Sequence, residues 1–129
     1  MKTTRHATYN LKYHIVWIPK YRESVLTGEV ADRVRTILHK IADDKDLEIL
    51  DLTVQPDHIH LFVSSPPKHA PSLLANWFKG ISSRKYNHRH ADHDDEKIGW
   101  ARGYYAGTAG QVSSETVQNY IQRHEEDES

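Results

Sequence analysis

The chain has 129 residues, of which 37% are hydrophobic and 27% are charged, and this composition predicts one globular domain spanning residues 1–129. The absence of cysteine excludes disulfides and thiol chemistry, and without a long apolar run or a signal peptide we expect a cytoplasmic protein that does not bind membranes. The formal net charge is −1, so nucleic-acid binding would require lysine and arginine to gather on one face.

The first half of the chain predicts a strand, a helix and a hairpin. Residues 9–18 alternate as a strand does, and Pro19 ends that strand. Apolar residues at helical spacing predict a helix that begins after Thr27, a favourable N-cap, and ends within residues 43–46. Residues 47–54 predict a second strand, and the turn at residues 55–57 is short enough to join it to a third strand as an antiparallel hairpin.

The second half predicts a helix, an edge strand and a final helix. A helix begins near Pro71 and carries an apolar stripe, whereas the histidine-rich and aspartate-rich residues 87–96 predict an exposed loop. Four glycines in residues 99–110 predict an edge strand followed by a flexible joint at residues 107–110. In the last helix Val117 and Ile121 form an apolar stripe, and Tyr120 and His124 form a neighbouring one.

This order of elements predicts an α+β fold. The first six elements follow the ferredoxin-like plan, an antiparallel sheet with two helices on one face. The seventh is a C-terminal helix that carries Tyr120.

The strongest candidate for chemistry is a pair of histidines within residues 55–63, QPDHIHLFV. Strand side chains alternate between faces, so His58 and His60 share one face, with Cα atoms roughly 6.5 Å apart. Neutral imidazole is a common metal ligand, so the pair predicts a metal site. Such pairs are more often structural, and two ligands alone bind a metal weakly, so a third ligand is needed.

His124 is the candidate third ligand, because its position one turn after Tyr120 places the two side chains together. A phenol has a pKa of about 10 and needs help to act as a nucleophile at neutral pH. A metal bound to a phosphate supplies that help. Oxygen-rich substrates favour Mg²⁺ or Mn²⁺, and three imidazoles also suit Zn²⁺ or Co²⁺.

At this point the chain resembles the single-tyrosine transposases of the HUH nuclease superfamily, which move insertion sequences as single-stranded DNA. The resemblance covers nearly the whole chain. It rests on five segments together: YHIVWIPKYR at 13–22, VLTGEVA at 25–31, PDHIHLFV at 56–63, KGISSR at 79–84 and SETVQNYI at 114–121.

The resemblance implies that His58 and His60 are metal ligands and that Tyr120 is the nucleophile. It further implies cleavage and rejoining of single-stranded DNA through a 5′-phosphotyrosine intermediate, recognition of DNA hairpins, and a homodimer with composite active sites. Relatives commonly have Gln four residues after the tyrosine, where this chain has His124. Residues 102–103 also depart from the usual Pro-Ser.

Basic residues are the candidates for DNA binding: Lys12, Lys20, Arg22, Lys79, Arg84 and Lys85. Three alternatives remain open at this point. One is a domesticated relative that cleaves repeats without mobilising itself. Another is a ferredoxin-like module that binds nucleic acid without catalysis, and the third is a Zn²⁺ hydrolase in which Tyr120 is structural.

Overall fold

The computed structural model describes the backbone of residues 10–108 and 114–128, and the side chains of residues 10–108 and 115–122. The part of the predicted joint at residues 109–110 lies outside these ranges. The described strands are β1 (Leu11–Trp17), β2 (Glu48–Gln55), β3 (His58–Ser65) and β4 (Tyr105–Thr108). The helices are α1 (Gly28–Asp44), α2 (Pro71–His90) and α3 (Ser114–Glu128), with short 3-10 turns η1 (Lys20–Arg22) and η2 (Asp94–Glu96).

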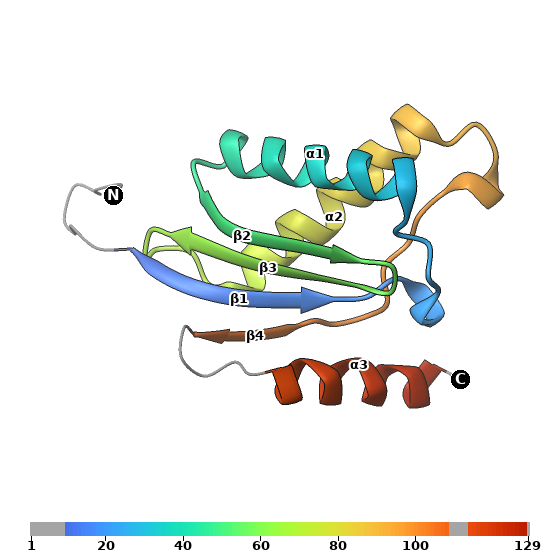
Figure 1. Ribbon diagram of the computed structural model, residues 1–129. Coiled ribbons are helices and arrows are strands. Elements are labelled where there is room, and N and C mark those ends of the chain that lie inside the picture. Colours follow the sequence, from blue (N-terminus) through green and yellow to red (C-terminus); the bar gives the residue numbers. More distant parts are fainter. Residues whose placement is uncertain (1–9, 109–113, 129) are drawn as a thin grey trace.

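The four strands form one antiparallel sheet in the order β2-β3-β1-β4. This order and the two helices on one face confirm the ferredoxin-like α+β prediction. Figure 1 shows α1 and α2 together on one side of the sheet and α3 on the other side, beside β4. No helix within the described residues is long and apolar enough to cross a membrane.

Alternation along β1 decides which core each residue joins. Ile15 and Trp17 are fully buried in the main core between the sheet and the helices α1 and α2, with Leu61 of β3 and Phe78 of α2. Val16 points to the opposite face, where a smaller core lies under α3. Because both faces of β1 are covered, this strand is apolar at nearly every position from 15 onward.

Two local predictions need correction. Helix α2 continues to His90, so the predicted loop at residues 87–96 begins only after that residue. Asn87 connects the last turn of α2 to Ile98. Its side chain accepts a hydrogen bond from the Ile98 N–H at 2.8 Å and donates one to the Ile98 carbonyl at 3.0 Å. Gly107 and Thr108, predicted as part of a joint, pair with β1 as the end of β4.

Candidate active site

The histidine pair lies on the sheet face opposite α1 and α2. His58 and His60 are half-buried, whereas Ile59 and Leu61 between and after them are fully buried in the main core. The predicted alternation is therefore confirmed. The buried residues hold β3 in place, and the imidazoles project from the other face of a rigid strand.

A carboxylate fixes the orientation of His58. Its Nδ1 lies 3.0 Å from Oδ1 of Asp57, in the turn between β2 and β3. A carboxylate can only accept, so Nδ1 is the donor, and in the neutral ring Nε2 keeps its lone pair. Arg22 of η1 lies on the far side of this carboxylate, with Nε 3.6 Å from Oδ2. Arg22, Asp57 and His58 therefore form a connected series of polar groups that leaves Nε2 available to a metal.

His60 is held by a different partner, His14 of β1. Antiparallel pairing places His14 opposite Phe62 and therefore diagonally beside His60. Nδ1 of His14 lies 2.8 Å from Nε2 of His60, and the His14 ring stacks on Phe62 with centroids 4.2 Å apart. Burial lowers the pKa of both histidines, and His14 and His58 lower that of His60 further. His14 and His60 are therefore neutral at pH 7, which is the form that binds metal, although Nε2 of His60 is here engaged by His14.

Sequence reasoning did not find the two partners His14 and Asp57. The alternation of residues 9–18 assigns His14 to a strand face, but no local pattern tells which residue of another strand it will meet. The sequence places Asp57 only in a turn, although a carboxylate that can reach a ring nitrogen of a candidate metal-binding histidine is a recognisable signal.

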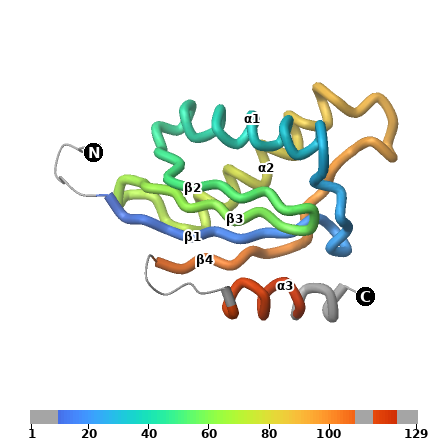
Figure 2. The backbone as a smooth tube through the Cα atoms, in the orientation of Figure 1, coloured from blue at the N-terminus to red at the C-terminus, as the bar shows by residue number. Residues whose placement is uncertain are grey.

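Tyr120 lies on the same sheet face as the histidines. Its ring belongs to the smaller core with Val16, Val117 and Ile121, and Val16 pairs directly with His60 across β1 and β3. Tyr120 is therefore part of the same buried stripe of α3 as Val117 and Ile121, and the prediction that it belongs to a neighbouring stripe is wrong. Figure 2 shows the tube of α3 running alongside β4 on the face away from α1 and α2.

The phenol of Tyr120 is enclosed in this arrangement. Only 4% of the residue is exposed, and the hydroxyl oxygen is buried. The ring packs near Tyr105 of β4, with centroids 6.4 Å apart, and both tyrosines line a cleft of about 240 Å³ with Thr116 and Asn119. Attack on a phosphate would therefore require α3 to present Tyr120 differently.

The position of His124 falls in α3, but its side chain lies outside the described residues. Among the described side chains, no three histidine, aspartate or glutamate residues gather as a metal site. The third-ligand prediction therefore stays a prediction.

The six basic candidates occupy different environments. Lys12 and Lys20 are exposed, and Lys12 shares the strand face of His14. Arg22 lies beside Asp57. Arg84 and Lys85 lie on α2, behind the opposite face of the sheet, with Nζ of Lys85 3.9 Å from Asp44. Lys79, also on α2, donates to the carbonyls of Ala101 at 3.0 Å and Gly103 at 2.5 Å, and burial lowers its pKa.

Known proteins similar to this chain are transposases. Residues 7–124 match the family described as "Transposase IS200 like". The ISDra2 transposase TnpA of Deinococcus radiodurans is 35% identical over 125 residues, covering 95% of this chain and 89% of that protein. The transposase for insertion sequence element IS200 of Salmonella typhimurium is 34% identical over 136 residues, covering 98% of this chain and 85% of that protein.

Solved structures of transposases share the fold of this chain. A crystal structure of a Deinococcus radiodurans protein assigned as a transposase has a TM-score of 0.79 and 33% identity, covering 99% of this chain and 98% of that one. A REP-associated tyrosine transposase bound to a REP hairpin shares the fold, with a TM-score of 0.58 and 15% identity. Fold and sequence together define the protein as a transposase. The chain belongs to the family of IS200-like transposases.

Proposed function

We propose that this transposase cleaves and rejoins single-stranded DNA at the ends of an insertion sequence, with Tyr120 as its nucleophile. The observation that carries the proposal is the common sheet face: His58 and His60 project from it, and α3 packs Tyr120 against it. The relatives are named as transposases of insertion sequences, which supports DNA ends as the substrate.

In the proposed reaction the phenolic oxygen of Tyr120 attacks a phosphodiester. The bond from phosphorus to the 3′ oxygen breaks, which gives a 5′-phosphotyrosine and a free 3′-hydroxyl. A second 3′-hydroxyl then attacks the phosphotyrosine and releases the phenol. Each step exchanges one phosphoester bond for another, so the reaction needs no ATP.

The donor set of the site suits a divalent metal at His58, whereas at His60 a metal would have to replace the contact between Nε2 and Nδ1 of His14. His58 presents Nε2 because Asp57 holds Nδ1, and burial keeps His60 neutral. We propose that these two residues hold Mg²⁺ or Mn²⁺, with Zn²⁺ or Co²⁺ as alternatives, and that His124 is the third ligand. When bound, the metal would stabilise negative charge on the phosphate and the attacking phenolate.

The contribution of His124 can be measured directly as Mn²⁺ affinity. His124→Ala should bind Mn²⁺ more weakly than wild type, and His124→Gln should bind Zn²⁺ more weakly than wild type because imidazole suits Zn²⁺ better than an amide oxygen does. His39→Ala, which removes an exposed histidine from α1, is the matched control. Equal affinity of wild type and His124→Ala would remove His124 from the ligand set.

We further propose a homodimer with composite sites, in which α3 of one subunit completes the histidine site of its partner. The resemblance to single-tyrosine transposases supports this proposal, and the buried Tyr120 hydroxyl is compatible with it, because the phenol must leave its present packing to reach a phosphate in either subunit. Mixing Tyr120→Phe subunits with His58→Ala subunits should restore one working site per dimer. A protein that stays monomeric in sedimentation, with and without DNA, would contradict the arrangement.

Recognition of a DNA hairpin near the cleavage site is also part of the proposal. A transposase with the same fold is bound to a REP hairpin, and this likeness supports hairpin DNA as a ligand. The exposed Lys12 and Lys20 are the best-placed candidates for phosphate contacts. Each lost contact should lower the slope of log K against log salt by about 0.7 on single strands.

The decisive experiment follows a labelled single-stranded end for a covalent adduct that survives denaturation. Tyr120→Phe should give no adduct while hairpin binding stays near wild type, because only the phenolic oxygen is lost. Tyr105→Phe is the matched control, since its ring lies 6.4 Å from that of Tyr120 and lines the same cleft. An adduct formed by Tyr120→Phe would remove this residue from the nucleophile role.

A further inference from the structure

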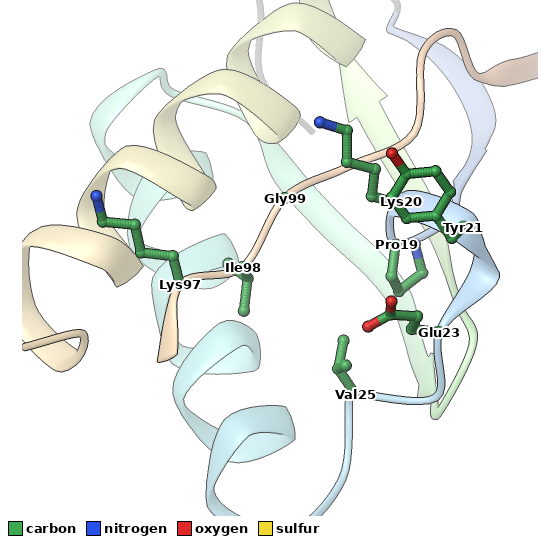
Figure 3. A pocket seen from close by; sticks show the side chains of 8 residues that line it. All are labelled: Pro19, Lys20, Tyr21, Glu23, Val25, Lys97, Ile98 and Gly99. Atoms are coloured by element: carbon green, nitrogen blue, oxygen red, sulfur yellow. The ribbon is translucent and has the colours of Figure 1, made fainter. Parts of the chain in front are cut away.

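A second cleft, of about 190 Å³, opens beside η1 (Figure 3). One of its walls is η1 with the residues that follow, and the other is the segment 97–99. The Lys20 N–H donates to the Gly99 carbonyl at 3.0 Å, and Pro19 and Trp100 form an isolated β-bridge. Because backbone contacts join the two walls, the cleft is formed without a ligand.

The lining of this cleft combines apolar, aromatic and charged groups. Pro19, Val25 and Ile98 supply its apolar part. Tyr21 is 62% exposed, and Figure 3 shows its ring beside the side chain of Lys20 at the edge of the cleft. An exposed aromatic ring next to an apolar recess is a surface on which a planar ligand can stack.

The backbone of η1 is held in an unusual conformation. Tyr21 and Arg22 have φ angles of 59° and 50°, in the left-handed region that residues other than glycine rarely adopt. Two successive residues of this kind persist only where the surroundings hold them, and such sites concentrate at ligand-binding positions. The conformation presents Tyr21 to solvent while Arg22 turns to Asp57.

The cleft is connected to the candidate active site. Nε of Arg22 lies 3.6 Å from Asp57, whose other oxygen holds His58 at 3.0 Å. The same turn also packs against α3, which carries Tyr120. A single strand of DNA with its scissile phosphate at His58 would therefore have neighbouring nucleotides within reach of η1.

We propose that this cleft binds one base of the single-stranded substrate, an inference that rests on the proposed function. Tyr21 stacks on the base, and the ammonium groups of Lys20 and Lys97 contact the flanking phosphates. Lys97 is at present paired with Asp94 at 3.0 Å in an exposed contact, which a phosphate can replace. Glu23 accepts a hydrogen bond from an exocyclic amino group, so the cleft prefers cytosine, adenine or guanine, which carry such a group, to thymine.

Binding is tested by fluorescence anisotropy with labelled 12-nucleotide strands of dC, dA and dT. Tyr21→Ala should weaken binding on the order of tenfold, whereas Tyr21→Phe should bind as wild type does, because stacking needs only the ring. Glu23→Gln should reduce the preference for dC and dA over dT, because an amide both donates and accepts. Glu29→Gln, which removes an exposed carboxylate from α1, is the control for charge alone.

A crosslink locates the contact independently. Strands that contain 5-iodocytosine should crosslink to the peptide carrying Tyr21 after irradiation. Wild-type affinity of Tyr21→Ala, or a base preference unchanged in Glu23→Gln, would overturn the proposal. Adduct formation at Tyr120 is scored in parallel, so a protein that forms the adduct but does not need Tyr21 refutes the base cleft alone.

Discussion

Lys79 allows a quantitative test of what a half-buried cation does in this fold. Its ammonium donates to the carbonyls of Ala101 and Gly103, and its own carbonyl accepts from Nε1 of Trp100 at 3.0 Å. These bonds tie α2 to the segment that leads into β4. Lys79→Met keeps the apolar stem but removes the ammonium, so both carbonyls lose their donor.

A hydrogen bond from a charged donor contributes about 1.5–3 kcal/mol when it is shielded from water. The bond to Ala101 is partly buried, but the bond to Gly103 is exposed and counts for little. The desolvation that lowers the pKa of Lys79 offsets part of the gain, because methionine is buried at no such cost. We therefore expect Lys79→Met to lower the free energy of unfolding by about 1–2 kcal/mol.

Urea unfolding followed by tryptophan fluorescence measures this difference. Lys85→Met is the control, because it removes a half-exposed lysine from the same helix. Its contact to Asp44 is 3.9 Å long, so the change should stay within about 0.5 kcal/mol. Equal losses in the two variants would refute the reasoning. A Lys79→Met protein with wild-type stability but a salt slope lower by about 0.7 would instead identify Lys79 as a phosphate contact.

Two further predictions concern the three histidines of the candidate site, His14, His58 and His60. Asp57→Ala should weaken Mn²⁺ binding, measured by calorimetry, about tenfold because it removes the acceptor that orients His58. Asp51→Ala removes a nearby carboxylate that makes no hydrogen bond to the His58 or His60 ring, so it should weaken Mn²⁺ binding far less. Equal losses of affinity in the two variants would mean that charge alone matters. The folded state also lowers the pKa of His14 and His60, so the unfolded chain binds more protons below pH 6.5. The free energy of unfolding should therefore fall as pH drops through 6.5 towards these lowered pKa values. In His14→Phe it should depend less steeply on pH. A free energy of unfolding that does not change between pH 7 and 5 would contradict this.

Much of the molecule follows from local sequence. A two-residue period fixes which side of β3 is buried, so the common face of His58 and His60 was predictable from seven or eight residues. A short turn permits only an antiparallel hairpin, which fixes the pairing of β2 with β3. The order of elements then leaves few arrangements open, and the ferredoxin-like sheet is the one observed.

Long-range pairing decided what surrounds the site. The contact between His14 and His60 joins residues 46 positions apart, and it depends on the register of β1 against β3. A shift of one residue would turn His14 to the other face, and no feature of either segment alone encodes that register. Docking of α3 likewise decided that Tyr120 is buried, because its exposure depends on which surface the helix packs against. The sequence alone thus determined the chemical groups and the faces that carry them, whereas the tertiary structure alone decided their partners, because those contacts form between segments that meet only when the sheet is complete.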